Sequence, residues 1–222
     1  MPGADDQTMM VDYYRQRARQ YDALYQTVAW RAELTALKDW LVVHANGKTI
    51  LEVAAGTGYW TTAAAPTAHS ITATDINPET LAIAATRNLG AHVTLAHADA
   101  WNLPDTPERF DLGMAHLWWS HLKKQDRGRF LSHFASRLRA RATLLMIDQN
   151  HVPGFGMPIS RRDADGNTYQ TRWLDSGERF EVVKNYPDRA ELEQSLGQTC
   201  EDIRLLQLTY FWAVSANFRP VP

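Results

Sequence analysis

The chain has 222 residues, of which 45% are hydrophobic and 22% are charged, a balance typical of one globular domain with a sizeable core. Its 23 basic and 25 acidic residues give a formal charge of −2, which gives no general attraction for nucleic acid. The single cysteine, Cys200, excludes an internal disulfide and a cysteine-based zinc site. No apolar run reaches the roughly 18 residues of a membrane span, and the first ten residues lack a signal-peptide core. We therefore expect a cytoplasmic protein with no metal, membrane or nucleic-acid partner.

The first part of the chain, residues 9–45, is predicted to be helical. Arg and Gln recur through YYRQRARQYDALYQ, and Ala, Leu and Trp are spaced for a buried face through AWRAELTALKDWLVV. Tyr14, Tyr21 and Tyr25 lie seven and four residues apart, on one face of such a helix. These tyrosines either pack in the core or form a lid that closes over bound molecules.

From residue 49 onward, short apolar segments alternate with helical ones. The patterns predict strands at 49–54, 70–74, 92–96, 110–115 and 143–148, and helices at 61–65, 78–89 and 125–139. Strands that alternate with helices form βαβ units. We therefore predict an α/β fold with a doubly wound, mostly parallel sheet covered on both faces.

Residues 150–186 interrupt this alternation. Prolines and glycines at 153–158 predict a loop, and 179–186 is the one candidate strand in an otherwise irregular, charged segment. Such a segment inside a compact domain is often a lid or a substrate wall. A helix at 188–196 and a β-hairpin over 202–215, at the edge of the sheet, are predicted to close the chain.

A tight turn with two glycines, EVAAGTG, follows the first predicted strand. Gly56 and Gly58 allow positive φ values and let a ligand approach the backbone closely. A dinucleotide-binding turn has a third glycine three positions after the second, and here that position is Thr61. Taken alone, the turn is compatible with a structural role or with several nucleotide cofactors.

Two carboxylates follow the next two predicted strands. Asp75 lies roughly 20 residues after Glu52, where an acid can accept hydrogen bonds from both ribose hydroxyls. Asp99 follows the third strand, where it can accept a hydrogen bond from an adenine amino group. Each of them could also be a helix cap or a turn residue. Because parallel strands end at one edge of a sheet, together they predict a cofactor-binding crevice there.

The segments ILEVAAGTGYWT, ATDINPETLAIA, HADAWNLPDTPERFD and ATLLMID resemble, in this order, the motifs of class I S-adenosylmethionine-dependent methyltransferases. The resemblance implies a Rossmann-like, seven-stranded sheet with an antiparallel last strand. It also implies S-adenosylmethionine as the cofactor and S-adenosylhomocysteine as the product. Within one domain, 1–222, we expect a helical cap (1–45), a cofactor-binding core (46–149), a substrate-side insertion (150–186) and a closing helix and hairpin (187–222).

The resemblance also assigns residues to the cofactor. The methionine end would be lined by Glu52, Ala54, Gly56 and Gly58. The ribose and the adenine ring would be met by Asp75, Ile76, Asp99 and Ala100. The run YYxxRAxxYD is similar to the cap of small-molecule methyltransferases and adds Tyr14 and Tyr21 to this set, with Tyr25 on the substrate side.

Two histidines, His116 and His121, follow the fourth predicted strand in MAHLWWSHL. Either could act as a base or orient the acceptor near the cofactor, and His116 could also contact the cofactor itself. The alternative is a histidine that only packs or makes a structural hydrogen bond.

The segment TRWLDSGERFEVVKNY, with the cap and AHLWWSH, is similar to a group that includes the dehydrophos phosphonate O-methyltransferase. By that resemblance Arg172 and Lys184 would bind an anionic substrate; otherwise they are a solvated basic pair on a surface strand. We expect O-methylation of a small phosphonate or carboxylate.

Three other functions remain open from the sequence. The first is N- or O-methylation of an uncharged or amine metabolite with His116 or His121 as the base. The second is a non-catalytic sensor or partner subunit that binds S-adenosylmethionine. The third, a nicotinamide-dependent oxidoreductase, is disfavoured by Thr61.

Overall fold

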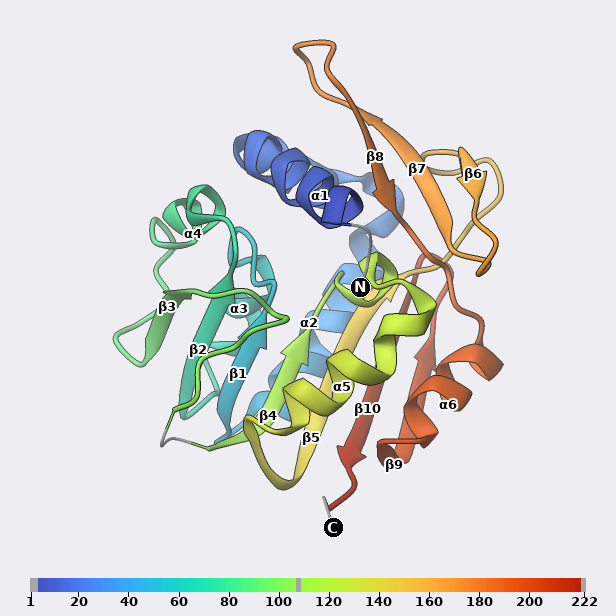
Figure 1. The fold of residues 1–222 in the computed structure, drawn as a ribbon. Coiled ribbons are helices and arrows are strands. Elements are labelled where there is room, and N and C mark those ends of the chain that lie inside the picture. Colours follow the sequence, from blue (N-terminus) through green and yellow to red (C-terminus); the bar gives the residue numbers. More distant parts are fainter. Residues whose placement is uncertain (1–3, 107–108, 221–222) are drawn as a thin grey trace.

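A seven-stranded sheet forms the centre of the molecule (Figure 1). In the computed structural model, which describes residues 4–106 and 109–220, its order is β3-β2-β1-β4-β5-β10-β9. The strands are β1 (Thr49–Val53), β2 (Ser70–Asp75), β3 (Val93–His97), β4 (Phe110–Ala115), β5 (Leu138–Gln149), β9 (Cys200–Gln207) and β10 (Phe211–Phe218). In the described part of this sheet, β10 pairs antiparallel with both β5 and β9, and all other neighbouring strands are parallel. The predicted doubly wound sheet with an antiparallel last strand is confirmed.

Helices cover both faces of this sheet. The described α-helices are α1 (Ala4–Arg17), α2 (Arg31–Ala45), α3 (Tyr59–Ala64), α4 (Pro78–Ala84), α5 (Arg127–Ala135) and α6 (Arg189–Gly197). Successive side chains of a strand point to opposite faces. In β5, Leu144 and Met146 therefore pack with α5 and α6, while Leu145 and Ile147 pack with α2 and α3. In Figure 1 α5 and α6 accordingly lie in front of the sheet and α2 behind it.

Residues 9–45 are helical as predicted, except at Thr27, but they do not form one continuous helix. Helix α1 ends at Arg17, and two 3-10 segments, η1 (Ala18–Gln26) and η2 (Val28–Trp30), precede α2. In η1, Tyr25 stacks on Tyr59 with the ring centroids 3.5 Å apart, and Asp22 forms an ion pair with Arg87 beside α4. These contacts with Tyr59 and Arg87 favour the 3-10 conformation over the regular helix that the sequence pattern predicts. Tertiary packing often overrides local helix preference in this way.

The segment 150–186 is more regular than predicted. It contains a second, antiparallel sheet of β6 (Arg161–Arg162), β7 (Thr168–Trp173) and β8 (Arg179–Val183). The predicted strand at 179–186 corresponds to β8, but β7 was missed because its polar residues Thr168 and Gln170 are buried and hide the alternation. The predicted helix 125–139 also ends early, since Leu138 already pairs with Phe110 in the sheet.

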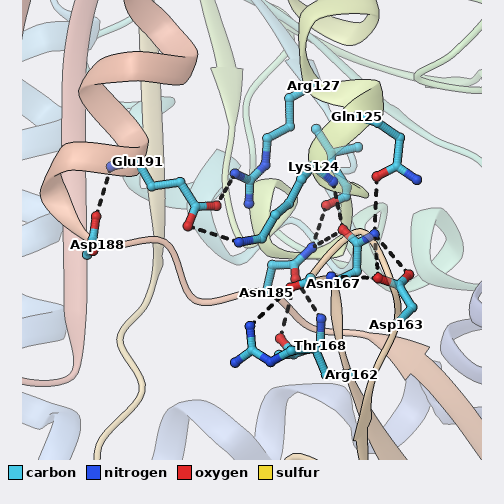
Figure 2. A network of polar contacts seen from close by, with 12 residues as sticks. Lys124, Gln125, Arg127, Arg162, Asp163, Asn167, Thr168, Asn185, Asp188 and Glu191 are labelled. Carbon is cyan, nitrogen blue, oxygen red and sulfur yellow. Dashed lines mark hydrogen bonds and ion pairs between the residues drawn. The ribbon is translucent and has the colours of Figure 1, made fainter.

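A polar network fixes the small sheet to the body of the protein (Figure 2). The Lys124 N–H donates to Asn167 Oδ1 (2.8 Å), and Asn185 Nδ2 donates to the carbonyl of Leu122 (2.9 Å). Asn167 precedes β7 and Asn185 follows β8. Nearby, Lys124 also forms an ion pair with Glu191 of α6. Buried polar groups that are fully paired in this way hold a single arrangement, so the position of the β7–β8 hairpin is well defined.

Helix α1 lies over the edge of the large sheet where its parallel strands end, between α4 and β8 (Figure 1). Met10 and Tyr13 of α1 pack against Phe180 and Val182 of β8 in a small apolar cluster. The N-terminal helix therefore covers the edge at which the sequence places the crevice. Within the described ranges, no helix combines the length and the apolar character that crossing a membrane requires.

Candidate active site

A cavity of about 850 Å³, partly open to solvent, lies at this edge of the sheet. Its floor consists of residues 54–57 after β1, 75–77 after β2, 98–100 after β3 and 116–118 after β4. Its roof consists of side chains from α1 and η1.

The structure brings most of the sequence-selected cofactor residues together in this cavity. Its walls include Tyr14, Tyr21, Ala54, Gly56, Asp75, Ile76, Asp99, Ala100 and His116. Tyr25, expected on the substrate side, also lines this cavity. Glu52 and Gly58 do not.

Glu52 lies beneath the glycine turn. Its side chain is 1% exposed, and Thr61 donates its hydroxyl proton to Glu52 Oε2 at 2.6 Å. Burial raises the pKa of Glu52 to about 7, an effect that the Thr61 hydrogen bond opposes. Thr61, the residue in place of a third glycine, thus ties the start of α3 to β1.

Glu52→Gln is expected to change how stability depends on pH. Because the pKa of Glu52 is about 7 when folded and 4.5 in its ordinary state, the native protein retains a proton that the unfolded chain releases between these values. The free energy of unfolding should therefore fall by roughly 3 kcal/mol as the pH rises through this window. The variant should lack this component. The measurement is urea unfolding of both proteins between about pH 5 and 8. A difference in the free energy of unfolding that stayed constant over this range would contradict the raised pKa of Glu52.

Gly58 is needed for packing between helices. Its φ is 75°, and a Cβ there would lie 3.0 Å from Cβ of Ala84 in α4. A side chain would have to displace α4 and adopt an unfavourable backbone conformation. The structure therefore gives Gly58 a packing role, and its contact with the cofactor stays a prediction.

Asp75 organises the glycine turn as well as facing the cavity. Its carboxylate accepts hydrogen bonds from the N–H of Gly56 (2.8 Å) and of Asn77 (2.8 Å). Burial raises the pKa of Asp75, and these two hydrogen bonds act against that rise. The Thr80 hydroxyl also donates to Oδ1, at 3.1 Å. A carboxylate has about four lone-pair sites, so Asp75 keeps part of its acceptor capacity towards the cavity.

Asp99 is held by the turn that follows β3. Its Oδ1 accepts a hydrogen bond from the Trp101 N–H at 2.9 Å, which is the turn role that the sequence left open. Asp99 also lines the cavity between Ala98 and Ala100. The two roles are compatible because the hydrogen bond occupies only part of the carboxylate.

The cap is attached to the glycine turn by polar contacts. The Thr57 hydroxyl donates to Asp22 Oδ1 (2.5 Å), and Arg87 pairs with the same carboxylate and also donates to the Thr57 carbonyl. One carboxylate of η1 thus connects the cap, the turn and the segment after α4. No pattern in the sequence marks this contact.

The hydrogen bonds of His121 determine its tautomer. Its Nδ1 lies 2.7 Å from the Val183 carbonyl, which can only accept, so Nδ1 carries the proton. Nε2 must then accept the hydrogen bond from the Tyr14 hydroxyl at 2.9 Å. Burial, with the positive charge of Lys184 nearby, lowers the pKa of His121 to about 3. His121 is therefore neutral and fully engaged at physiological pH.

His116 differs from His121 in having unpaired ring nitrogens. Both are buried without a hydrogen-bond partner among the described residues, and the ring lies 5.5 Å from that of Trp60. Burial lowers the pKa of His116 to about 3. Buried imidazole nitrogens usually have partners, so these two atoms mark a place where a bound molecule could supply polar groups.

A second cavity, of about 450 Å³, adjoins the first. Tyr14, Tyr21, Leu117 and His121 line both cavities and form a shared wall. The remaining walls of the second cavity are Arg17, Leu24, Trp30, Gln149, Arg172 and Lys184. Arg172 and Lys184, which the sequence selected, thus lie together, and Arg17 and Gln149 were missed.

Lys184 is not solvated, so that alternative was wrong for this residue. Its side chain is 3% exposed, and its Nζ lies 2.7 Å from Ser120 Oγ and 3.1 Å from Asp148 Oδ1. Burial alone would raise the pKa of Asp148, but Lys184 and neighbouring donors hold it below its ordinary value. Lys184 thus contributes to the cavity wall with its charge already offset.

The positive charge of Arg172 is less compensated by neighbouring groups than that of Lys184. Its Nη2 donates to Gln170 Oε1 at 2.5 Å, and its buried Nε has no partner among the described residues. Gln170 is neutral, so the positive charge of Arg172 remains available. No group of three His, Cys, Asp or Glu residues within 4–106 and 109–220 could hold a metal ion.

Comparison with known proteins agrees with this geometry. Residues 50–141 match the family described as "Methyltransferase domain". No curated protein matches the sequence. The structure of DhpI in complex with SAH is 24% identical, with a TM-score of 0.79 and coverage of 97% of both chains. The DhpI–SAM–HEP complex is 23% identical, with the same TM-score and coverage of 97% and 99%.

A more distant match has a different acceptor. The Burkholderia thailandensis 1,6-didemethyltoxoflavin-N1-methyltransferase, solved with 1,6-didemethyltoxoflavin and S-adenosylhomocysteine, is 15% identical. Its TM-score is 0.66, and the match covers 99% of this chain and 91% of that one. Residues 50–141 thus match a methyltransferase domain, and the chain shares the fold of solved structures that bind S-adenosylmethionine or S-adenosylhomocysteine.

Proposed function

We propose that this protein uses S-adenosylmethionine to methylate an oxygen atom of a small anionic metabolite, a phosphonate or a carboxylate. The observation that supports this most is the pair of adjoining cavities. One has the carboxylates and the glycine turn suited to the cofactor, and the other has Arg17, Arg172 and Lys184 in its walls.

The residues of the first cavity fit this cofactor. Asp75 has acceptor capacity for the ribose hydroxyls and Asp99 for the adenine amino group, while Ile76 and Ala100 supply apolar surface beside the ring. Gly56 has a φ of 57°, and no atom lies within 4 Å of the point that a Cβ would occupy there, which leaves room beside the turn. The unpartnered His116 nitrogens lie on the wall next to Leu117.

S-adenosylmethionine, when bound, supplies an electrophilic methyl group on a positively charged sulfur. The protein's task is then to align the acceptor oxygen with that methyl group and to exclude water. Tyr14, Tyr21 and the side chain of Leu117 form the wall between the two cavities. These residues would guide the acceptor towards the methyl group, and α1 above them would shield the reaction from solvent.

An anionic oxygen already has the electron pair that attacks the methyl group, so the reaction needs no base. The carbon–sulfur bond breaks with its electrons going to sulfur, and the new carbon–oxygen bond uses the acceptor's lone pair. This agrees with His121, whose Nδ1 proton donates to Val183 and whose Nε2 is occupied by Tyr14. Nearby Lys184 further disfavours a positively charged His121.

Methylation of an amine or a hydroxyl is the second candidate. It is favoured by His116, whose ring nitrogens are unpaired, and by the existence of an N-methyltransferase with this fold. Because its pKa is about 3, however, His116 is a weak base. Enzymes with the same fold can act on many different substrates, so the acceptor must be identified by measuring turnover.

The test is turnover with a panel of acceptors. Purified protein with S-adenosylmethionine should release S-adenosylhomocysteine when given small phosphonates or carboxylates, and the product should be a methyl ester by mass spectrometry. Amines, phenols and uncharged alcohols of similar size should react far more slowly. Turnover of only these latter compounds would overturn the anionic acceptor, and cofactor binding without turnover of any compound would favour a sensor.

A further inference from the structure

Two guanidinium groups reach the second cavity from different parts of the fold. Arg172 extends from β7 in the small sheet, and Arg17 comes from the last turn of α1 in the cap. Arg17 Nη1 donates to the Tyr13 hydroxyl at 2.6 Å. Tyr13 itself packs against Phe180 of β8, with ring centroids 5.6 Å apart. Arg17 is therefore held in place by the same contact that seats α1 on the hairpin.

The charges of the three basic residues in this cavity are balanced differently. Lys184 has the buried carboxylate of Asp148 at 3.1 Å. Arg17 and Arg172 donate to neutral oxygens, those of Tyr13 and Gln170, and no described carboxylate forms an ion pair with either. Two positive charges thus face the cavity without a counter-charge from the described side chains.

Both guanidiniums lie close to the wall shared with the cofactor cavity. Burial raises the pKa of the Tyr21 hydroxyl, and the positive charges of Arg17 and Arg172 both oppose that rise. Tyr21 lines both cavities. The two charges are therefore near the place where the acceptor would meet the methyl group.

We propose that Arg17 is a substrate-binding residue which, with Arg172, makes the site specific for an acid carrying two negative charges. This inference rests on the proposed function. Each guanidinium can make charge-assisted hydrogen bonds to an acid oxygen. Methylation turns a doubly charged acid into a singly charged ester. The product therefore loses part of this attraction and binds more weakly than the substrate.

The inference also gives the cap a function in recognition. Arg17 belongs to α1, which covers the site, whereas Arg172 belongs to the hairpin. An acid held between them would add a further contact between the cap and the hairpin, which already pack together through Tyr13 and Phe180.

The experiment measures binding to protein saturated with S-adenosylhomocysteine. Calorimetry is carried out at a mildly alkaline pH with methylphosphonate, which is doubly charged there, and with its singly charged monomethyl ester. Arg17→Gln should weaken methylphosphonate binding by about ten-fold or more, the scale of one charge-assisted contact. Binding of the monomethyl ester should change by less than about three-fold, and Arg17→Lys should recover part of the loss.

Two controls distinguish a direct contact between Arg17 and the acid from a general disturbance of the site. Arg19→Gln changes an exposed arginine two residues further on that does not line the cavity, and it should bind as the wild type does. Affinity for S-adenosylhomocysteine should be unchanged in every variant, which shows that the cofactor cavity is intact. If Arg17→Gln weakens binding of both the cofactor and the acid, Arg17→Lys is the deciding variant. If Arg17→Lys does not recover affinity for the acid, the proposal is wrong.

The failures are also distinguishable. Suppose that the wild type binds methylphosphonate and that Arg172→Gln weakens this binding but Arg17→Gln does not. The role proposed for Arg17 is then wrong, while the proposed function stands. If the wild type binds the ester as tightly as the doubly charged acid, the charge preference is wrong. If it binds neither compound, the anionic acceptor itself is overturned, and this inference with it.

Discussion

Replacing Lys184 by methionine is expected to lower the free energy of unfolding by about 3–5 kcal/mol, because it leaves the fully buried carboxylate of Asp148 without its counter-charge. Asp148 would retain the N–H groups of Ser120 and Gln149 as donors, but hydrogen bonds alone compensate a buried charge poorly. Urea unfolding at neutral pH measures the loss, and the melting temperature should fall in parallel.

Two further variants test the cause. Asp148→Asn combined with Lys184→Met removes both charges and should recover a large part of the stability. Lys124→Met removes a partly exposed ion pair with Glu191 and should cost only about 1 kcal/mol or less. If Lys184→Met were no more destabilising than Lys124→Met, the buried ion pair would not have the importance that its geometry suggests.

Replacing Asp75 by alanine is expected to weaken binding of S-adenosylhomocysteine by about 100-fold. Loss of hydrogen bonds between a carboxylate and the ribose hydroxyls accounts for roughly 1.5–3 kcal/mol. The change should lie at the upper end of this range because the N–H groups of Gly56 and Asn77 also lose their acceptor. Calorimetry with S-adenosylhomocysteine measures the effect directly.

A nearby acid provides the matched control. Glu79 is exposed in the first turn of α4, so Glu79→Gln changes the local charge without touching the cavity and should leave affinity within about two-fold. Asp75→Asn keeps the shape of the side chain and should fall between the wild type and alanine. Unchanged affinity in Asp75→Ala would mean that the ribose lies elsewhere.

The first cavity was largely predictable from sequence because it is built from strand ends. Once β1, β2 and β3 are recognised as parallel neighbours, the residues after each of them must meet at one edge of the sheet. Asp75 and Asp99 follow from that rule, whatever the rest of the fold does. Glu52 and Gly58 were harder to place, since their neighbours Thr61 and Ala84 are set by how α3 and α4 pack.

The second cavity was only partly predictable because it joins segments that are far apart in the chain. Arg172 and Lys184 were found through a resemblance, while Arg17 and Gln149 have no local pattern that marks them. The burial of Lys184 depends on Asp148, which lies at the end of a different strand in a different sheet. The break between α1 and η1 likewise depends on contacts with Tyr59 and Arg87 that periodicity does not reveal.

A structure with S-adenosylhomocysteine and a methylatable acid bound would be the decisive test of the proposed site. We expect the ribose at Asp75, the adenine at Asp99 and the sulfur facing the wall formed by Tyr14, Tyr21, Leu117 and His121. The acid should lie across that wall, in contact with Arg172. A cofactor whose sulfur points away from the second cavity, or an acid bound outside it, would contradict the account.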